Sequence, residues 1–409
     1  MNAHAAASAA EPWDIRSSRP VELICFGLCV ATVVYLAASL VLGLWLFDSE
    51  GRLIPTDFVN VWAAGRLVLE GRPAAPYDQA IHQAIEYASI GYAFDGYYGW
   101  LYPPPFLFVA ALAATLPLAA AQVLWSLLTF PAYVAAVRMI VGQRIGILLA
   151  CAFPAVLSNF VVGQNGFLSA ALLGGALGLM ERRPVLAGCL LGLLTYKPHL
   201  GILFPLVLIA GGRWRVFFAA AAVAVLLGVT SWAAFGAGTW TAFFQSLPIG
   251  SQAILTEGQG DWDKLQSLFG IVRALRGSEA LAWWLQGAFI GVTALLLCAL
   301  WRSSVSFDLK AAALASGALL ATPYLYMYDY VVLAVPMAFL VHAGLASGFQ
   351  RGEMLGFAVA GLLILIFPFV KAPIGPVATL IVAVLIGRRV VLELRSGTAV
   401  EPDLRLRPS

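Results

Sequence analysis

The 409-residue sequence has few charged residues. Asp, Glu, Lys and Arg together make up 11% of it, whereas 61% of the residues are hydrophobic. Soluble domains carry roughly 25% charged residues. A soluble protein of this length could not cover its surface with so few charges, so a water-soluble globular enzyme is excluded. The net charge is only +3 and no basic stripe stands out, so nucleic acid is not an expected partner.

Motifs of several enzyme classes are also absent. The sequence has no P-loop, no G-x-G-x-x-G, no H-E-x-x-H and no cluster of His, Cys and Asp with metal-ligand spacing. Its only D-x-D is Asp261-Trp262-Asp263, a weak match to a metal–nucleotide site. The five cysteines lie in apolar stretches without a C-x-x-C pair, as small packing residues do. Neither a metal ion nor an organic cofactor is expected.

Long apolar runs dominate what is present. The first, about 21–47, is longer than a signal-peptide core and reaches the roughly 20 residues needed to cross a bilayer. Further runs follow between 103 and 388, several of them short and broken by Pro or Gly. We predict an all-α polytopic membrane protein with about 12 transmembrane helices, some ending inside the bundle. The stretch 103–140 fits either two crossings or one crossing and a re-entrant piece.

Arginines mark the short loops, which the positive-inside rule places in the cytoplasm together with both termini. The two long polar segments then face the periplasm of a bacterial inner membrane. Each holds an amphipathic stretch that suits a helix along the membrane surface. The predicted organisation is a cytoplasmic segment at 1–20, a transmembrane domain at 21–394 with external segments at about 48–101 and 236–280, and a disordered cytoplasmic tail at 395–409.

Asp57 and Lys197 are the first two candidates for chemistry. Asp57 follows the first apolar run, and partial desolvation at a membrane boundary raises the pKa of an acid towards that of a useful general base. The alternative is a helix N-cap formed by Thr56 or Asp57. Lys197 lies with His199 in TYKPHLG, where Pro198 interrupts two short apolar runs. Such a break suits an anionic group, especially a phosphate, unless the lysine snorkels to the surface.

Three further stretches carry polar or aromatic side chains. Gln164 and Asn165 in GQNGF suit sugar hydroxyls or helix caps. In TPYLYMYDYVV, tyrosines including Tyr324 and Tyr328 surround Asp329 and suit a sugar or a lipid headgroup. An interfacial aromatic belt would also account for the tyrosines, although it does not account for the acid. In WLYPPPFLF, three prolines start a helix stiffly and position one tyrosine, Tyr102, at the interface.

In order and spacing, these stretches together resemble glycosyltransferase family 87. The resemblance covers roughly residues 20–390. It is carried by Asp57-Phe58 leading to Trp62, Ala63, Arg66, Gly71, Tyr77 and Asp78, then by Tyr102-Pro103-Pro104, Gly163-Gln164-Asn165, Lys197-Pro198-His199 and Thr322-Pro323-Tyr324 ahead of Tyr328-Asp329. The best-known member type of this family is the polyprenol-phosphate-mannose-dependent α-1,2-mannosyltransferase, which the chain resembles. One departure is Tyr326-Met327-Tyr328-Asp329, which stands where those enzymes have a His-rich segment.

The resemblance implies a GT-C bundle with an extracytoplasmic active site and an inverting, metal-independent transfer. A hexose, mannose in the compared enzymes, would move from a polyprenyl-phosphate sugar to a lipid or glycan acceptor. Asp57 takes the place of the base. Lys197 and His199 would bind the donor phosphate, and the predicted substrate-binding residues are Trp62, Arg66, Tyr102, Gln164, Asn165, Tyr324, Tyr328 and Asp329. The alternatives are a transporter or lipid flippase without covalent chemistry and a scaffold subunit, although the chain lacks the matching halves of a transporter.

Overall fold

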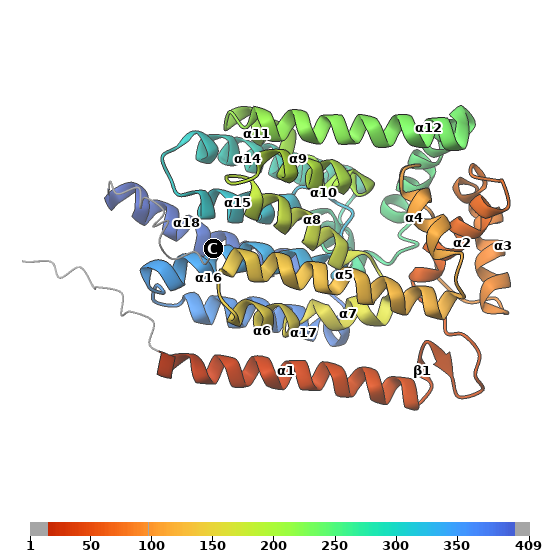
Figure 1. Cartoon of the computed structure of the whole chain (residues 1–409), viewed down its shortest axis with the longest axis horizontal. Coiled ribbons are helices and arrows are strands. Elements are labelled where there is room, and N and C mark those ends of the chain that lie inside the picture. The colour runs from red at the N-terminus through yellow and green to blue at the C-terminus, as the bar shows by residue number, and fades with distance from the viewer. Residues whose placement is uncertain (1–14, 97, 397–409) are drawn as a thin grey trace, which may run out of the picture.

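The computed structural model describes residues 15–96 and 98–396, and these residues form a bundle of helices. The long helices run roughly side by side, with α1 (Ile15–Val41) and α12 (Trp214–Ser251) on opposite outer sides (Figure 1). A group of shorter elements covers one end of the bundle. Most of the predicted N-terminal segment and of the predicted tail lies outside the described residues.

Six helical stretches in the described part of the chain are long and apolar enough to cross a membrane. A seventh is possible if the bent pair α6 (Ile145–Cys151) and α7 (Ala155–Val162), with 56° between its halves, counts as one crossing. These stretches confirm the polytopic all-α prediction, whereas the count of about 12 crossings stays a prediction. The six are Arg19–Val41 in α1, Leu118–Val141 (α5), Trp214–Thr256 in α12 and η3 (Gln252–Thr256), Glu279–Arg302 (α14), Met327–Ser347 in η5 (Met327–Leu333) and α16 (Ala334–Ser347), and Glu353–Val370 (α17).

Shorter helices fill the middle of the bundle. Proline sets several of their boundaries: it cannot donate a backbone hydrogen bond inside a helix but fits the first turn, as Pro184 and Pro198 do here. Lys197 is thereby left between two helices. The short central helices are α8 (Gly166–Leu179), α9 (Pro184–Leu193), η2 (Leu194–Tyr196), α10 (Pro198–Gly201), α11 (Phe204–Ala210) and α15 (Phe307–Leu320), and the C-terminal helix is α18 (Gly375–Ser396).

Most of the end layer comes from the two predicted external segments, and β1 and α4 come from the apolar stretches that flank the first of them. Its helix α2 (Phe58–Leu69) has the bounds expected from the apolar spacing, and most of its residues are buried. At Gly65 the helix passes so close to the Ala110 carbonyl of α4 that a side chain would not fit. The other elements of this layer are β1 (Leu44–Trp45), β2 (Phe47–Asp48), η1 (Ala75–Tyr77), α3 (Gln79–Ile90), α4 (Phe106–Ala113), η4 (Trp262–Lys264) and α13 (Leu268–Ala274).

Two stretches show more precisely where helices run. Between 103 and 141 there is one long helix, α5, preceded by the short α4, so only α5 is long enough to cross. Helix α12 continues to Ser251 through a break at Gly236, where φ is 81°. The segment beginning at 236 therefore starts as helix, because glycine tolerates the positive φ that interrupts the helix without ending it.

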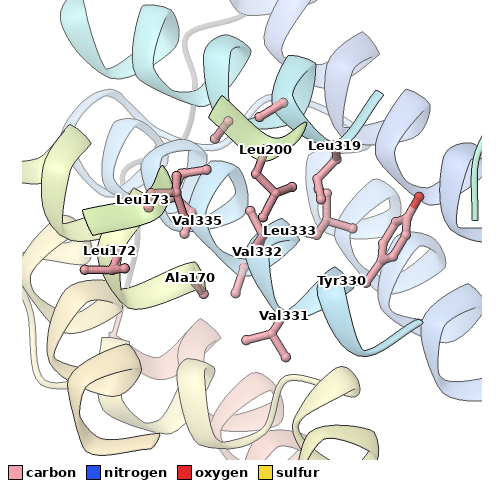
Figure 2. Close-up of a cluster of buried hydrophobic side chains, with 14 of the residues drawn as sticks. Ala170, Leu172, Leu173, Leu200, Leu319, Tyr330, Val331, Val332, Leu333 and Val335 are labelled. Carbon is pink, nitrogen blue, oxygen red and sulfur yellow. The ribbon is translucent and has the colours of Figure 1, made fainter. Parts of the chain in front are cut away.

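A buried apolar cluster holds η5 in place (Figure 2). Val331, Val332 and Leu333 of η5 share one buried cluster with Ala170 and Leu173 of α8 and with Leu200 and Leu319. The residues of η5 just named are fully buried. Their side chains fix the position of the residues immediately before them, which include Asp329. The core thus orients a polar segment at the end of the bundle where α2 and α3 lie.

Candidate active site

Asp57 precedes α2 and its side chain does not cap that helix. One carboxylate oxygen, Oδ2, instead accepts a hydrogen bond from Nε2 of Gln164 at 3.1 Å, across 107 residues of sequence. The neighbouring Thr56 also turns away from the helix, because its hydroxyl donates to Oε1 of Gln122 at 2.8 Å. Asp57 thus occupies the N-cap position, but neither its side chain nor that of Thr56 caps the helix. The second oxygen, Oδ1, carries no hydrogen bond from any described residue.

Gln164 and Asn165 form a polar junction between α7 and α8 and cap neither helix with their side chains. Gln164 Oε1 accepts from the Tyr102 hydroxyl at 3.3 Å, and Asn165 Nδ2 donates to that hydroxyl at 2.8 Å. The Tyr102 ring lies 6.2 Å from that of Tyr196, whose hydroxyl donates to the Asn165 carbonyl at 3.2 Å. Asp57 thus belongs to a hydrogen-bonded group that the three-proline turn and the α7–α8 junction build together.

Lys197 does not snorkel to the surface. Its ammonium lies 2.5 Å from Oδ1 of Asp329, and the two side chains are 5% and 2% exposed. The ammonium also lies 5.2 Å from the centre of the Tyr328 ring. An ammonium has three donors, and among the described residues Asp329 is its only hydrogen-bond acceptor. Two N–H directions are therefore left for another acceptor.

The segment that carries Asp329 is held from two sides. Asp329 Oδ2 accepts from the backbone N–H of Tyr326 at 3.3 Å, and Asn159 donates to the Tyr328 carbonyl at 2.6 Å. Tyr326 and Tyr328 stack with 5.7 Å between their rings. Tyr324 turns elsewhere: its hydroxyl bonds Ser251 at the end of α12. The tyrosine stretch therefore serves both the site and the packing of the end layer.

His199 lies close to the Lys197–Asp329 pair, one residue beyond Pro198. Its Nε2 atom is buried and has no hydrogen-bond partner. Buried polar atoms are normally paired, and an orphan calls for a ligand or a water molecule. The imidazole is thus available as a further polar group on the lysine side of the site.

Electrostatics make Asp57 a plausible base. Burial is the main cause that raises its pKa to about 6, and the neighbouring Asp329 acts in the same direction. The Gln164 hydrogen bond and the cations Lys264 and Lys197 oppose this rise. A carboxyl with this pKa is ionised at neutral pH and still basic enough to take a proton from a hydroxyl.

Lys264 is not among the residues predicted from the sequence, in which the preceding Asp261-Trp262-Asp263 is only a weak match to a metal–nucleotide site. It lies in η4 and pairs with Asp261 at 2.8 Å. Among the described residues no group of three or more His, Cys, Asp or Glu side chains could hold a metal ion. The signal that could have found Lys264 is its place as the basic residue that directly follows two acids in the second external segment.

Trp62 and Arg66 are not brought into this cluster. The Trp62 indole donates to the Leu116 carbonyl at 2.8 Å, and the Arg66 guanidinium lies over that indole and near Glu70. Arg66 is also half-exposed, with 44% of its side chain accessible. Their predicted roles in substrate binding stay predictions, since their contacts lie on the outward face of α2.

The sequence model of glycosyltransferase family 87 matches residues 100–323, more than half of the chain. The chain belongs to this family, as the resemblance predicted, and is a membrane glycosyltransferase with a sugar donor and an acceptor. The match includes Tyr102, Gln164, Asn165 and Lys197, and it begins after Asp57 and ends before Asp329. No curated protein and no solved structure matches the chain.

Proposed function

We propose that this family 87 enzyme transfers a hexose, mannose in the polyprenol-phosphate-mannose-dependent members, from a polyprenyl-phosphate sugar to a lipid or glycan acceptor. The observation that supports this most is the junction of two charged centres at one end of the bundle. Asp57 is joined to Gln164 and Asn165, and the buried Lys197–Asp329 pair lies near enough to act on the Asp57 carboxyl. A base and an anion site side by side are what such a transfer requires.

In the proposed reaction, Asp57 takes the proton of the acceptor hydroxyl. The hydroxyl oxygen bonds to the anomeric carbon as the bond from that carbon to the phosphate oxygen breaks, which inverts the configuration. The leaving polyprenyl phosphate is anionic, and the two unused N–H groups of Lys197, with His199 beside them, supply donors for it. Gln164 orients the Asp57 carboxylate so that Oδ1 stays open to the acceptor.

The proposed orientation places this end of the bundle in the periplasm of a bacterial inner membrane. The arginine-bearing loops at 142–144, 180–183 and 211–213 lie at the other end, away from α2 and α3 (Figure 1). The positive-inside rule assigns that end to the cytoplasm. A polyprenyl donor suits this arrangement, because its tail stays in the bilayer while its sugar reaches the end layer.

The test is sugar transfer by purified enzyme in lipid, with a polyprenyl-phosphate sugar compared with a nucleotide sugar. Asp57→Asn keeps the size of the side chain and removes its basicity. We expect it to lose roughly 10²–10⁴-fold in rate, as general-base variants do. More than about a tenth of the wild-type rate in Asp57→Asn would overturn the base assignment. Transfer from the nucleotide sugar alone would overturn the donor class.

A further inference from the structure

Helix α3 buries an acid and a histidine that the proposed reaction does not use. His82 and Glu86 lie one helical turn apart and are 0% and 1% exposed. His82 Nδ1 and Glu86 Oε1 face each other at 3.5 Å, and both atoms are buried without a hydrogen-bond partner. Unpaired ionisable groups are costly inside a protein, so this arrangement needs an account.

The histidine contact on the other side fixes the tautomer. His82 Nε2 lies 3.1 Å from the Asn60 carbonyl, which is only an acceptor, so Nε2 carries a proton. In the neutral ring, Nδ1 is then an acceptor, and a protonated Glu86 is the donor that completes it. Burial lowers the pKa of His82 to about 4, and burial followed by the charge of Asp57 raises that of Glu86 to about 8. Near neutral pH the pair is therefore uncharged, with one proton on His82 Nε2 and one on the Glu86 carboxyl that faces Nδ1.

The pair is tied to the segments that hold Asp57. Asn60, whose carbonyl accepts the hydrogen bond from His82, donates its own backbone N–H to the Asp57 carbonyl at 3.3 Å. Its side-chain amide donates to the carbonyls of Tyr98 and Gly99, in the loop that leads to Tyr102. His82 thus contacts the first turn of α2, and through Asn60 it fixes the stretch that orients the Gln164 network.

The ionisable groups that surround α3 do not neutralise the charges of Glu86 and Asp57. In the segment at 98–102, burial and then the charges of Asp57 and Glu86 raise the pKa of Tyr98 to about 12. On α2, Arg66 turns outward to Glu70. On η1, the hydroxyl of Tyr77 donates to the Tyr102 carbonyl at 3.0 Å. No cation among the groups just named stands between Glu86 and Asp57 to neutralise a second negative charge.

We propose that His82 and Glu86 form a positioning pair for Asp57, which keeps the Glu86 proton buried behind the base so that Asp57 alone is anionic. The inference rests on the proposed role of Asp57. The charge of Asp57 acts on the buried Glu86, and two carboxylates that interact in a poorly hydrated layer do not both ionise easily. When Glu86 loses its proton, its carboxylate faces the lone pair of His82 Nδ1, and the anchor on the first turn of α2 is weakened. Transfer is then slowed at alkaline pH.

The first test is the dependence of kcat on pH in wild type and in Glu86→Gln. Gln mimics the protonated acid at every pH, because its amide still donates to Nδ1. We expect the wild-type rate to fall above a pH of about 8, and Glu86→Gln to keep the acid limb and lose this alkaline fall. Glu86→Ala should lower the rate at all pH values by roughly ten- to a hundredfold through misplacement of the base. Glu50→Gln, an exposed acid of the same segment, is the matched control and should behave as wild type.

The same alkaline fall in Glu86→Gln as in wild type would overturn the proposal. A second measurement needs no activity and no variant. Wild-type enzyme in lipid is treated with a hydrophobic carbodiimide, which reacts with protonated buried carboxyls, on either side of the Glu86 pKa. Peptide mass spectrometry should find Glu86 labelled below that pKa and unlabelled above it. A Glu86 that is unlabelled at both pH values would contradict the proposed pair, even if Asp57 is the base. Labelling of Glu86 together with an active Asp57→Asn would instead remove the proposed function and its positioning role.

Discussion

Two buried ion pairs differ in how many of their donors are used. Arg389 binds both oxygens of Glu353, at 2.5 and 2.6 Å, and also donates to Ser347 Oγ and the Gly348 carbonyl. Lys197 has Asp329 as its one acceptor among the described residues. Both cations are almost fully buried, with 7% and 5% of the side chain exposed. Arg389 and Lys197 are therefore both buried and both paired with a carboxylate. They differ in that Lys197 has unused hydrogen-bond donors.

This difference separates a structural pair from a binding one. The guanidinium of Arg389 joins the α16–α17 loop to α18 with a planar set of bonds that leaves little room for a ligand. Lys197 lies in a break between short helices, beside the orphan Nε2 of His199. A buried ion pair whose cation keeps free donors and whose neighbours are unsatisfied is thus the better candidate for an anion site.

Of the changes at the two ion pairs, replacing Lys197 is expected to have the largest effect on transfer. In Lys197→Met with Asp329→Leu, both charges are removed and no buried charge is left unpaired. We expect transfer to fall roughly 10²–10³-fold, as on loss of a donor to a developing anion, while the unfolding midpoint stays close to wild type. Initial rates and thermal unfolding in the same lipid check this. Activity near wild type would show that the pair is structural after all.

The matched change at the Arg389–Glu353 pair should lower the stability of the protein and leave its activity unchanged. Arg389→Met alone leaves Glu353 buried and uncompensated and should destabilise the protein by about 3–5 kcal/mol. The double variant Arg389→Met with Glu353→Met should recover most of this stability. The folded fraction of each should keep its kcat and KM. A double variant that is stable and inactive would place this pair in the mechanism and break the comparison.

The sequence predicts some parts of the fold and of the candidate site better than others. The bounds of α2 followed from apolar spacing, and Pro198 indicated the break between helices at which Lys197 lies. That Asp57, Lys197 and Asp329 share one end of the bundle is predicted by the positive-inside topology, independently of the family resemblance. The bond from Gln164 to Asp57 and the partner of Lys197 span more than 100 residues, so only tertiary packing determines them. The helix beyond Gly236 was missed because glycine normally signals an end.

The dependence of kcat/KM on pH tests the role of Asp57 separately from that of Lys197. The pKa of Asp57 is raised to about 6, so the carboxyl keeps its proton up to that pH and becomes a base only above it. We expect kcat/KM to fall about tenfold per pH unit below this value and to be constant just above it. A rate profile in wild-type enzyme measures it. An acid limb near the ordinary pKa of aspartate would contradict the buried environment that we assign to the base.

The smallest effect is expected at Lys264. Its positive charge lowers the pKa of Asp57, so Lys264→Gln should move the acid limb to higher pH. The shift should stay below about one unit, because the side chain is 58% exposed and water screens it. Raising the salt concentration should move the wild-type limb in the same direction and reduce the difference between the two enzymes. A limb that moves to lower pH would show that Lys264 acts in another way.

Binding of polyprenyl phosphate, the leaving group itself, tests the central claim most directly. Its Kd is measured in lipid for wild type, Asp57→Asn and the Lys197→Met, Asp329→Leu double variant. The account predicts that Asp57→Asn binds it at least as tightly as wild type while transferring no sugar, and that the lysine variant loses about tenfold or more in affinity, the worth of one charge-assisted hydrogen bond. Wild-type affinity in the lysine variant, with weak binding in Asp57→Asn, would contradict the assignment of base and phosphate site.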